Sequence, residues 1–334
     1  MHATRTILLS VGLAAVLTTS LSTAPVAAAT SRSRVPAATT VARTPATTTR
    51  PAPTPKHPVP HKVRRPGRAK AVMPTRARAA LRPGLTSEPM TYHGGVLMTA
   101  PAHVYLVWYG DWSGRPAVPV LTDLVRGFGG SAYAATNTTY TDGGGRHVTA
   151  DVTLAGSVDD TYSHGRTLTD AAVKSVGRRA VTRGGLPVDP DGVHVVLTSS
   201  DVRESSGFGT RYCGWHSHGT VAGANLKYVF AGDPSTQAPR DCAAPVAPTP
   251  TGDLAADALA STVVHELDET LPDPYLDGWY DRWFIENGDK CAWTYGPLRR
   301  TPSGAWINVR LGGRDLLVQR NWVVSPTQGC AMAA

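Results

Sequence analysis

The sequence predicts an α/β or α+β fold, with a single globular domain built around one main mixed sheet. Three observations support this prediction. Residues 87–334 alternate between short apolar runs typical of strands and longer segments typical of helices. All four cysteines lie in the second half of the chain, and residues 30–86 have no periodic apolar pattern. We therefore expect three parts: residues 1–29, 30–86 and 87–334.

Residues 1–29 have the pattern of a secretory signal peptide. Arg5 provides a positive start, residues 7–17 are apolar, and residues 27–29 are three alanines suited to cleavage. The apolar run is too short for a membrane span, and no later run reaches 18 apolar residues. We expect a secreted protein without a membrane span, located outside the cell or at the cell wall.

Residues 30–86 are rich in Ala, Pro, Thr and Arg, a composition that favours a disordered, semi-rigid linker. Residues 1–85 hold 14 basic and no acidic residues, whereas the remaining 19 basic and 25 acidic residues give a net charge of −6. An exported basic segment is better suited to an anionic cell-wall polymer or a membrane surface than to nucleic acid. A spacer without a dedicated partner is the alternative.

Five apolar runs bounded by turn residues predict the strands of the sheet. The clearest is AHVYLVWY, at residues 102–109, which Gly110 follows. The others are residues 148–154, 193–198, 226–230 and 316–324. Near-continuous apolar character in the first and third of these runs indicates strands that are buried on both faces.

Three helices are predicted between these strands, at residues 118–128, 167–183 and 253–271. The last follows Thr251-Gly252, is rich in Ala and Leu, and ends at Pro272. A helical wheel divides it into an apolar face that would pack on the sheet and a polar face. The polar residues on that face are Ser261, Thr262, His265, Glu266, Asp268 and Glu269.

Cys213, Cys242, Cys291 and Cys330 predict two disulfides, because their number is even and the expected compartment is oxidising. Four cysteines allow three pairings. We predict the sequential one, 213–242 and 291–330, since each pair brackets a loop-rich segment. No C-x-x-C spacing supports a structural zinc site built from these cysteines.

The motif His265-Glu266-x-x-Glu269 indicates a zincin-like helix in which a carboxylate replaces the second histidine. Residues four apart lie on one helix face and can bind the same ion. Glu266 would be the catalytic residue that activates a metal-bound water. Glu286 and Asp289 follow the helix and are the expected further metal ligands, with Asp273 as an additional candidate.

Two alternatives stay open for this segment. An i,i+4 His–Glu pair is also ordinary on an exposed helix face. The series of aspartates after Pro272 could instead form turns or a calcium loop, since Ca²⁺ prefers oxygen ligands. Zinc is therefore the expected cofactor for an enzyme, and calcium is the alternative for a structural site.

Two further groups of residues are candidates for binding. His216 and His218 would lie on one side of an extended chain, from which either could supply an additional imidazole to the metal site. Ordinary hydrogen bonds near a disulfide are the alternative role for both. Trp279 and Trp283 are the candidates for a ligand surface, although large aromatic residues also fill protein cores.

Several sequence blocks resemble the phosphate-induced protein/EXORDIUM family. The blocks occur in the family's order at residues 91–114, 195–202, 212–216, 263–281, 286–291 and 316–323. The family motif His-Glu-Leu-Ala-Glu is matched at His265, Glu266 and Glu269, with Asp268 in place of the small residue. Glu286 and Asp289 match Glu-Ile-Gly-Asp, with Asn287 in place of the apolar residue. The resemblance implies a secreted or wall protein of one globular domain.

The sequence thus leads to two hypotheses of function. The first is an extracellular zinc-dependent hydrolase that acts on peptide or wall material. The second is a non-catalytic extracellular or wall-associated binding protein in which any metal is structural. The sequence predicts no oligomeric state.

Overall fold

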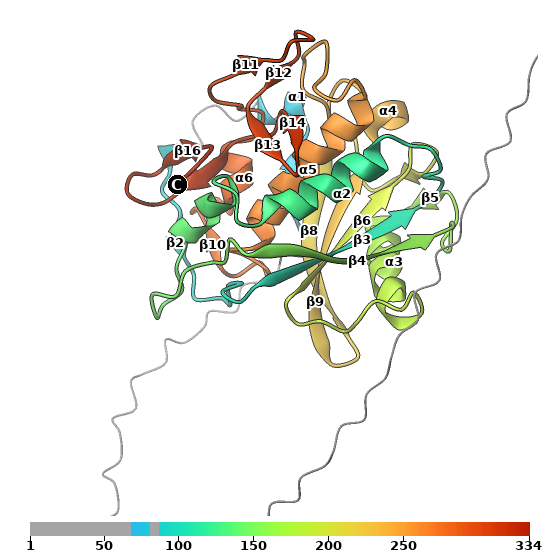
Figure 1. Cartoon of the computed structure of the whole chain (residues 1–334). Helices are drawn as coiled ribbons and strands as arrows, with labels where there is room; N and C mark the ends of the chain where they lie inside the picture. The colour runs from blue at the N-terminus through green and yellow to red at the C-terminus, as the bar shows by residue number, and fades with distance from the viewer. Residues whose placement is uncertain (1–67, 81–86) are drawn as a thin grey trace, which may run out of the picture. The chain divides into compact units, whose positions relative to one another are not determined.

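The computed structural model describes residues 68–80 and 87–334. Its centre is a six-stranded mixed sheet with the order β1-β8-β9-β6-β3-β4 (Figure 1). β3, β4, β6 and β9 run parallel, while β1 and β8 are antiparallel to their neighbours. The strands are β1 (Ala71–Pro74), β3 (Ala102–Tyr109), β4 (Val152–Asp160), β6 (Gly192–Thr198), β8 (Tyr212–Val221) and β9 (Ala224–Gly232).

Helices cover both faces of this sheet, which makes a three-layer architecture. α2 (Ala117–Phe128) and α5 (Leu254–Thr270) share one apolar cluster with the sheet, and α3 (Asp170–Thr182) shares a second cluster on the opposite face. In Figure 1 α2 and α5 lie together in front of the strands, with α3 behind β4. The predicted α/β class with one main mixed sheet is confirmed.

Short elements complete the described part of the chain. They surround the main sheet as two-residue and three-residue strand pairs and as single helical turns. They are α1 (Arg76–Ala79), β2 (Thr91–Tyr92), η2 (Ala134–Thr139), β5 (Thr167–Leu168), β7 (Arg203–Glu204), α4 (Pro234–Gln237), β10 (Trp279–Tyr280), α6 (Asn287–Lys290), β11 (Arg299–Arg300), β12 (Trp306–Ile307), β13 (Val309–Leu311), β14 (Arg314–Leu316), β15 (Asn321–Val323) and β16 (Gly329–Ala331).

The predicted helices and disulfides agree with the structure. α2, α3 and α5 begin and end within three residues of the predicted bounds. Asp253 caps α5 by accepting a hydrogen bond from the amide of Ala256 at 2.8 Å. The disulfides are Cys213–Cys242 and Cys291–Cys330, which confirms the sequential pairing.

Two predicted strands differ from those observed. β4 starts at Val152 rather than at residue 148 and alternates buried and more exposed residues, as expected for a strand at the edge of the sheet. Residues 316–324 do not form one strand of the sheet. They contribute the end of β14 and all of β15, which pair separately with β13 and β16. Most of their apolar side chains are buried beside the sheet. The prediction was wrong because an apolar run indicates burial but does not show whether the segment joins the sheet.

The predicted start of the folded domain at residue 87 is too late. β1 (Ala71–Pro74) pairs with β8 along the edge of the main sheet, and Ala71 and Met73 are buried. The apolar run in β1 is only four residues long and follows a basic, proline-rich stretch, which is why composition assigned it to the linker. The predicted signal peptide and the linker up to residue 67 lie outside the described residues.

Candidate functional site

α5 presents its polar residues to the protein interior. All residues from Ala255 to Thr270 on this helix are buried, and Glu266 and Glu269 have no exposed surface. The helix packs on β9 through its apolar residues, while β8, α6 and β1 lie close to its polar side. The alternative of an exposed polar face is therefore excluded. Carboxylates buried at such a position require partners or neutralisation.

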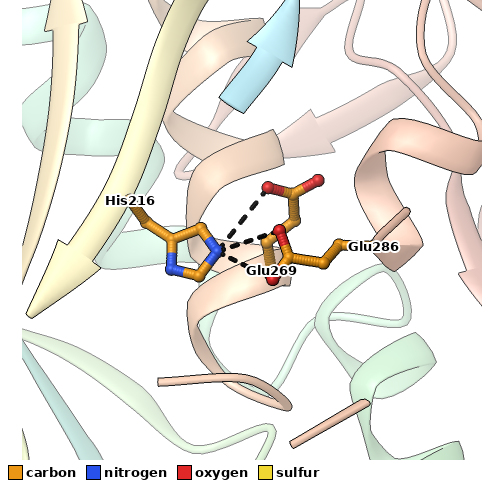
Figure 2. A group of neighbouring side chains, drawn as sticks. All are labelled: His216, Glu269 and Glu286. Atoms are coloured by element: carbon orange, nitrogen blue, oxygen red, sulfur yellow. Dashed lines mark hydrogen bonds and ion pairs between the residues drawn. The ribbon is translucent and has the colours of Figure 1, made fainter. Parts of the chain in front are cut away.

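His216, Glu269 and Glu286 converge from three separate elements (Figure 2). His216 lies on β8, Glu269 in the last turn of α5, and Glu286 immediately before α6. The Nε2 atom of His216 is 3.3 Å from both carboxylate oxygens of Glu286 and 3.8 Å from Oε2 of Glu269. One potential ligand atom of each residue lies within 4.8 Å of the others, a spacing that suits one metal ion.

His265, Glu266 and Glu269 form a second convergent set on α5 itself. The Nε2 atom of His265 lies 3.1 Å from Oε1 of Glu269 and 3.6 Å from Oδ1 of Asp289. The amide of Asp289 donates a hydrogen bond to Oε1 of Glu269 at 2.9 Å. The predicted ligands are thus brought together but divided between two sets, with Glu286 beside His216 rather than His265.

Asp273 joins the cluster from the turn that follows α5. Its Oδ1 atom accepts a hydrogen bond from the amide of Gly278 at 2.6 Å, which holds the turn closed. The charge of Glu286 acts on this carboxyl group and raises its pKa. Two neighbouring buried carboxyl groups need either a shared proton or a nearby cation.

Several buried polar atoms of the cluster have no hydrogen-bond partner in the structure. Such atoms are costly, because each has lost its hydration without a replacement. Among the described residues, those on potential metal-ligating side chains are His216 Nδ1, His265 Nδ1 and Nε2, Glu266 Oε2, Glu269 Oε2, Asp273 Oδ2 and Asp289 Oδ1, and Arg68 Nη1 also lacks a partner.

Burial raises the pKa of most carboxyl groups in the cluster. It holds the pKa of Glu266, Asp273 and Glu286 well above the ordinary range, with added repulsion from neighbouring carboxylates. The pKa of Asp289 is raised to about 6 for the same reasons. The positive charge that the protein supplies therefore does not offset the burial of these carboxyl groups.

Glu269 differs from its neighbours. Burial favours its neutral form, but His265 and His216 outweigh that effect and hold its pKa below the ordinary value. For His265, the attraction of Glu269 and Asp289 outweighs burial and raises the pKa well above the ordinary value. Burial lowers the pKa of His216. Glu269 is thus the carboxylate around which both imidazoles are arranged.

Two glycines allow backbone to approach the cluster closely. A Cβ atom on Gly214 of β8 would lie 2.7 Å from Oε1 of Glu266, and one on Gly288 of α6 would lie 3.0 Å from Oε1 of Glu269. The first distance is too short for any side chain at position 214. The amide of Met73 on β1 donates to the same Glu266 oxygen at 3.3 Å.

Arg68 is a cluster residue that the sequence did not reveal. Its Nη1 atom lies 3.8 Å from Oε1 of Glu286, and a quarter of its side chain is exposed. Nothing distinguishes it from the other arginines of the basic segment, so the sequence holds no signal for this role. Only its position just before β1 places it against the site.

Three predicted binding residues have other surroundings. His218 lies on β8 but its Nδ1 is 3.0 Å from Oδ1 of Asn225, and its ring contacts Tyr275 edge-on. Trp279 is half-buried, and its indole donates to the carbonyl of Thr141 at 2.9 Å. Trp283 is 56% exposed and lies beside Arg282. Trp283 is thus the more accessible of the two tryptophans.

The described residues include no helix that is long and apolar enough to cross a membrane. A family model described as "Phosphate-induced protein 1 conserved region" matches residues 90–302. The span includes β8, α5 and α6 and thus all the cluster residues except Arg68. The match agrees with the family resemblance of the sequence blocks.

Curated relatives come from Arabidopsis thaliana. Protein EXORDIUM-like 5 is 31% identical over 277 residues, which is 71% of this chain and 75% of the relative. Protein EXORDIUM-like 3 is 29% identical over 270 residues, 70% of this chain and 80% of the relative. Protein EXORDIUM is 24% identical over 241 residues, 62% of this chain and 74% of the relative. No solved structure matches the chain.

Proposed function

We propose that this chain, which belongs to the phosphate-induced protein 1 family, acts outside the cell as a metal-dependent hydrolase. The two disulfides and the pattern of a signal peptide support export. The proposed ion lies in the buried cluster, and peptide or wall material is the proposed substrate class.

One observation supports the metal above all others. Imidazoles and carboxylates from β8, α5 and α6 converge in the interior with atoms that lack partners. Burial of unpaired ionisable groups is unfavourable by several kcal/mol each, on the order of magnitude found for desolvated charges. A divalent cation would satisfy the lone pairs and restore the ionised form of the carboxylates.

The donor types favour zinc over calcium. His216 and His265 each offer an imidazole nitrogen, a ligand that suits Zn²⁺ and other transition metals. A calcium site consists of oxygen ligands instead. The set His216, Glu269 and Glu286 has the three protein ligands of a catalytic zinc site, in which a fourth position is left for water or substrate.

Glu266 is the proposed proton acceptor. It is adjacent to His265 on α5, its Oε1 is held by the amide of Met73, and its Oε2 has no partner. A bound zinc ion would supply a water molecule acidic enough to be deprotonated by such a group.

A structural ion is the second candidate function, and the burial of the cluster favours it. His216, Glu266, Glu269, Asp273 and Glu286 have no exposed surface, so substrate would reach them only after neighbouring residues move. Arg68 is the partly exposed residue at this boundary. In this version the ion ties β8, α5 and α6 together, and the protein works by binding rather than by catalysis.

Elemental analysis of the secreted full-length protein, followed by an activity screen, tests both versions. Peptide libraries and isolated wall polymers would be incubated with wild type and with Glu266→Gln. Asp257→Asn is the matched control, because it replaces another buried acid of α5 that binds Thr251 instead. For the hydrolase we expect zinc in both variants, and at least a 100-fold lower turnover only in Glu266→Gln, as for the loss of a general base.

The other outcomes are equally informative. Bound zinc without turnover of any substrate, together with a lower melting temperature after chelation, would support the structural ion. Purified protein that holds no transition metal and does not take up added Zn²⁺ would contradict both versions.

A further inference from the structure

We propose that the cluster holds two metal ions, with Glu269 as the carboxylate that bridges them. This inference deepens the proposed function and rests on it. Each of the two convergent sets contains one imidazole, and Glu269 is the one residue they share. A single ion would use one set and leave the other without a cation.

The orientation of Glu269 is the first argument for a bridge. Its Oε1 atom faces His265, at 3.1 Å from Nε2, while its Oε2 atom faces His216, at 3.8 Å from Nε2. The two oxygens therefore point toward different imidazoles. The amide of Asp289 holds Oε1 at 2.9 Å and so fixes this orientation. A carboxylate that offers one oxygen to each of two ions has this arrangement.

Each set also has its own additional carboxylates. Asp289 Oδ1 lies 3.6 Å from Nε2 of His265 and has no hydrogen-bond partner. Asp273 contacts Glu286, which lies beside His216. The first ion would thus have His216, Glu269 and Glu286 with Asp273 nearby, and the second would have His265, Glu266 and Glu269 with Asp289 nearby.

Charge balance is the second argument. Five carboxylates in the cluster carry −5 when ionised, and Arg68 contributes +1, which leaves −4. Two divalent ions neutralise this charge, whereas one ion leaves −2, or −1 when His265 is protonated, in a buried cluster. An uncompensated buried charge is strongly unfavourable. The carboxylates are Glu266, Glu269, Asp273, Glu286 and Asp289.

The distances fit known two-metal geometry. Ligand atoms within each set lie within 4.8 Å of one another, and both sets meet at Glu269. Two-metal hydrolase sites hold their ions about 3.5–4 Å apart, which a single bridging carboxylate can span. In this arrangement Glu266 is a ligand of the second ion, so the two-ion site gives it a role different from that of a free base.

Metal stoichiometry of the full-length protein tests the inference without an activity assay. Apo protein would be titrated with Zn²⁺ and analysed by mass spectrometry under native conditions and by elemental analysis. A parallel titration with Mn²⁺ would be followed by electron paramagnetic resonance, in which a carboxylate-bridged pair gives an exchange-coupled signal. The variants are His216→Ala and His265→Ala, and the matched control is His218→Ala on the same strand, which contacts Asn225.

We expect two ions in wild type and in His218→Ala, and one ion in each of the other variants. The coupled Mn²⁺ signal should appear only where two ions bind. One ion in wild type, lost in His216→Ala but retained in His265→Ala, would overturn the bridge and leave the proposed single-ion function intact. No bound metal in wild type would overturn both. The wild-type count decides the question even if a variant does not fold.

Discussion

At the scale of single residues, Glu269 determines how the candidate site is arranged. It is the member of α5 that reaches both His216 on β8 and Asp289 on α6. In H-E-x-x-H helices this position holds an imidazole, which has a single free nitrogen for the metal. A carboxylate has two oxygens. The replacement that weakens a single zinc site is therefore the replacement that makes a bridge feasible.

Two departures from the family motif meet in one buried network. Asp268, which replaces a small residue, accepts hydrogen bonds from Asn137 at 2.7 Å and from Tyr133 at 2.8 Å. Asn287, which replaces an apolar residue, donates to the carbonyl of Asp268 at 2.7 Å and to Asn321 at 2.9 Å. The sequence shows both substitutions, but only the fold shows that they support each other between α5 and α6.

His194 is a buried residue outside the site whose charge should control stability in acid. It lies on β6 between Tyr105 and Tyr228. Burial lowers its pKa to about 4, although a hydrogen bond with the backbone of Lys227 and the charge of Asp189 partly oppose the shift. The folded state thus resists protonation. The contribution of neutral His194 to the stability of the folded state is complete above its pKa in the unfolded chain, about 6.5. This contribution is lost as the pH falls toward 4.

We expect His194→Phe to reduce this loss of stability in acid. The shift corresponds to roughly 3 kcal/mol of unfolding free energy between pH 7 and pH 4. Urea unfolding at several pH values gives the unfolding free energy of wild type and variant as a function of pH. The difference between the two curves measures the contribution of His194, because the site carboxylates titrate equally in both proteins. His147→Gln, at an exposed histidine, is the control. Parallel curves for wild type and His194→Phe would contradict the assignment.

The sequence predicted most residues of the candidate site but not their grouping. His265, Glu266 and Glu269 share a helix face, so local periodicity was sufficient to place them together. Glu286 could be paired with the wrong imidazole because 70 residues separate it from His216. Arg68 could not be found at all, since its role depends on where β1 joins the sheet.

At the scale of elements, the bounds were predicted well where the sequence has local start and stop signals, and poorly where it has none. α5 begins at a side-chain cap and ends before Pro272, and both signals are local. β1 has no such signal, because four apolar residues become a strand only through pairing with β8. The run at residues 316–324 shows the converse case, in which apolar residues pack beside the sheet without joining it.

The disulfide Cys291–Cys330 should contribute more to metal retention at the candidate site than the disulfide Cys213–Cys242 does. Cys291 directly follows α6, which carries Asp289 and begins after Glu286. Replacing both cysteines by alanine removes a cross-link over 39 residues, and we expect a loss of about 4 kcal/mol in unfolding free energy. We also expect faster metal release, because a one-turn helix depends on this anchor.

The variant that lacks Cys213–Cys242 is the matched control for stability. Its loop spans 29 residues, so the entropic effect should be similar. β8 would still be held between β1 and β9, and His216 would keep its place. The rate at which a chelator removes the metal should be measured on both disulfide variants, at a temperature where both are folded. Equal rates would show that α6 does not need its disulfide.

At the scale of the whole molecule, charge divides the chain into two unlike parts. Residues 1–67 contain nine basic residues and no acidic ones, whereas residues 68–334 contain 24 basic and 25 acidic residues. The folded part is therefore close to neutral. Any general attraction to anionic polymers must come from the segment before Arg68.

We expect the full-length chain to bind polygalacturonate beads at low salt, and a chain beginning at Arg68 to stay in solution. Binding should decline as salt rises from about 0.05 M to 0.5 M, because the Debye length falls below 10 Å in this range. The measurement is the fraction of protein retained after washing. Equal retention of both chains would place the contact on the folded part and contradict the basic-segment prediction.

The position of β1 has a mechanical consequence. If the basic segment is fixed to a wall, tension enters the domain at Arg68 and reaches β1 before any other strand. β1 is held to β8 by a short ladder, and β8 carries His216. Stretching would therefore detach the strand whose Met73 amide supports Glu266 before it disturbs the parallel strands. The same connection that anchors the molecule would make its buried cluster sensitive to pulling.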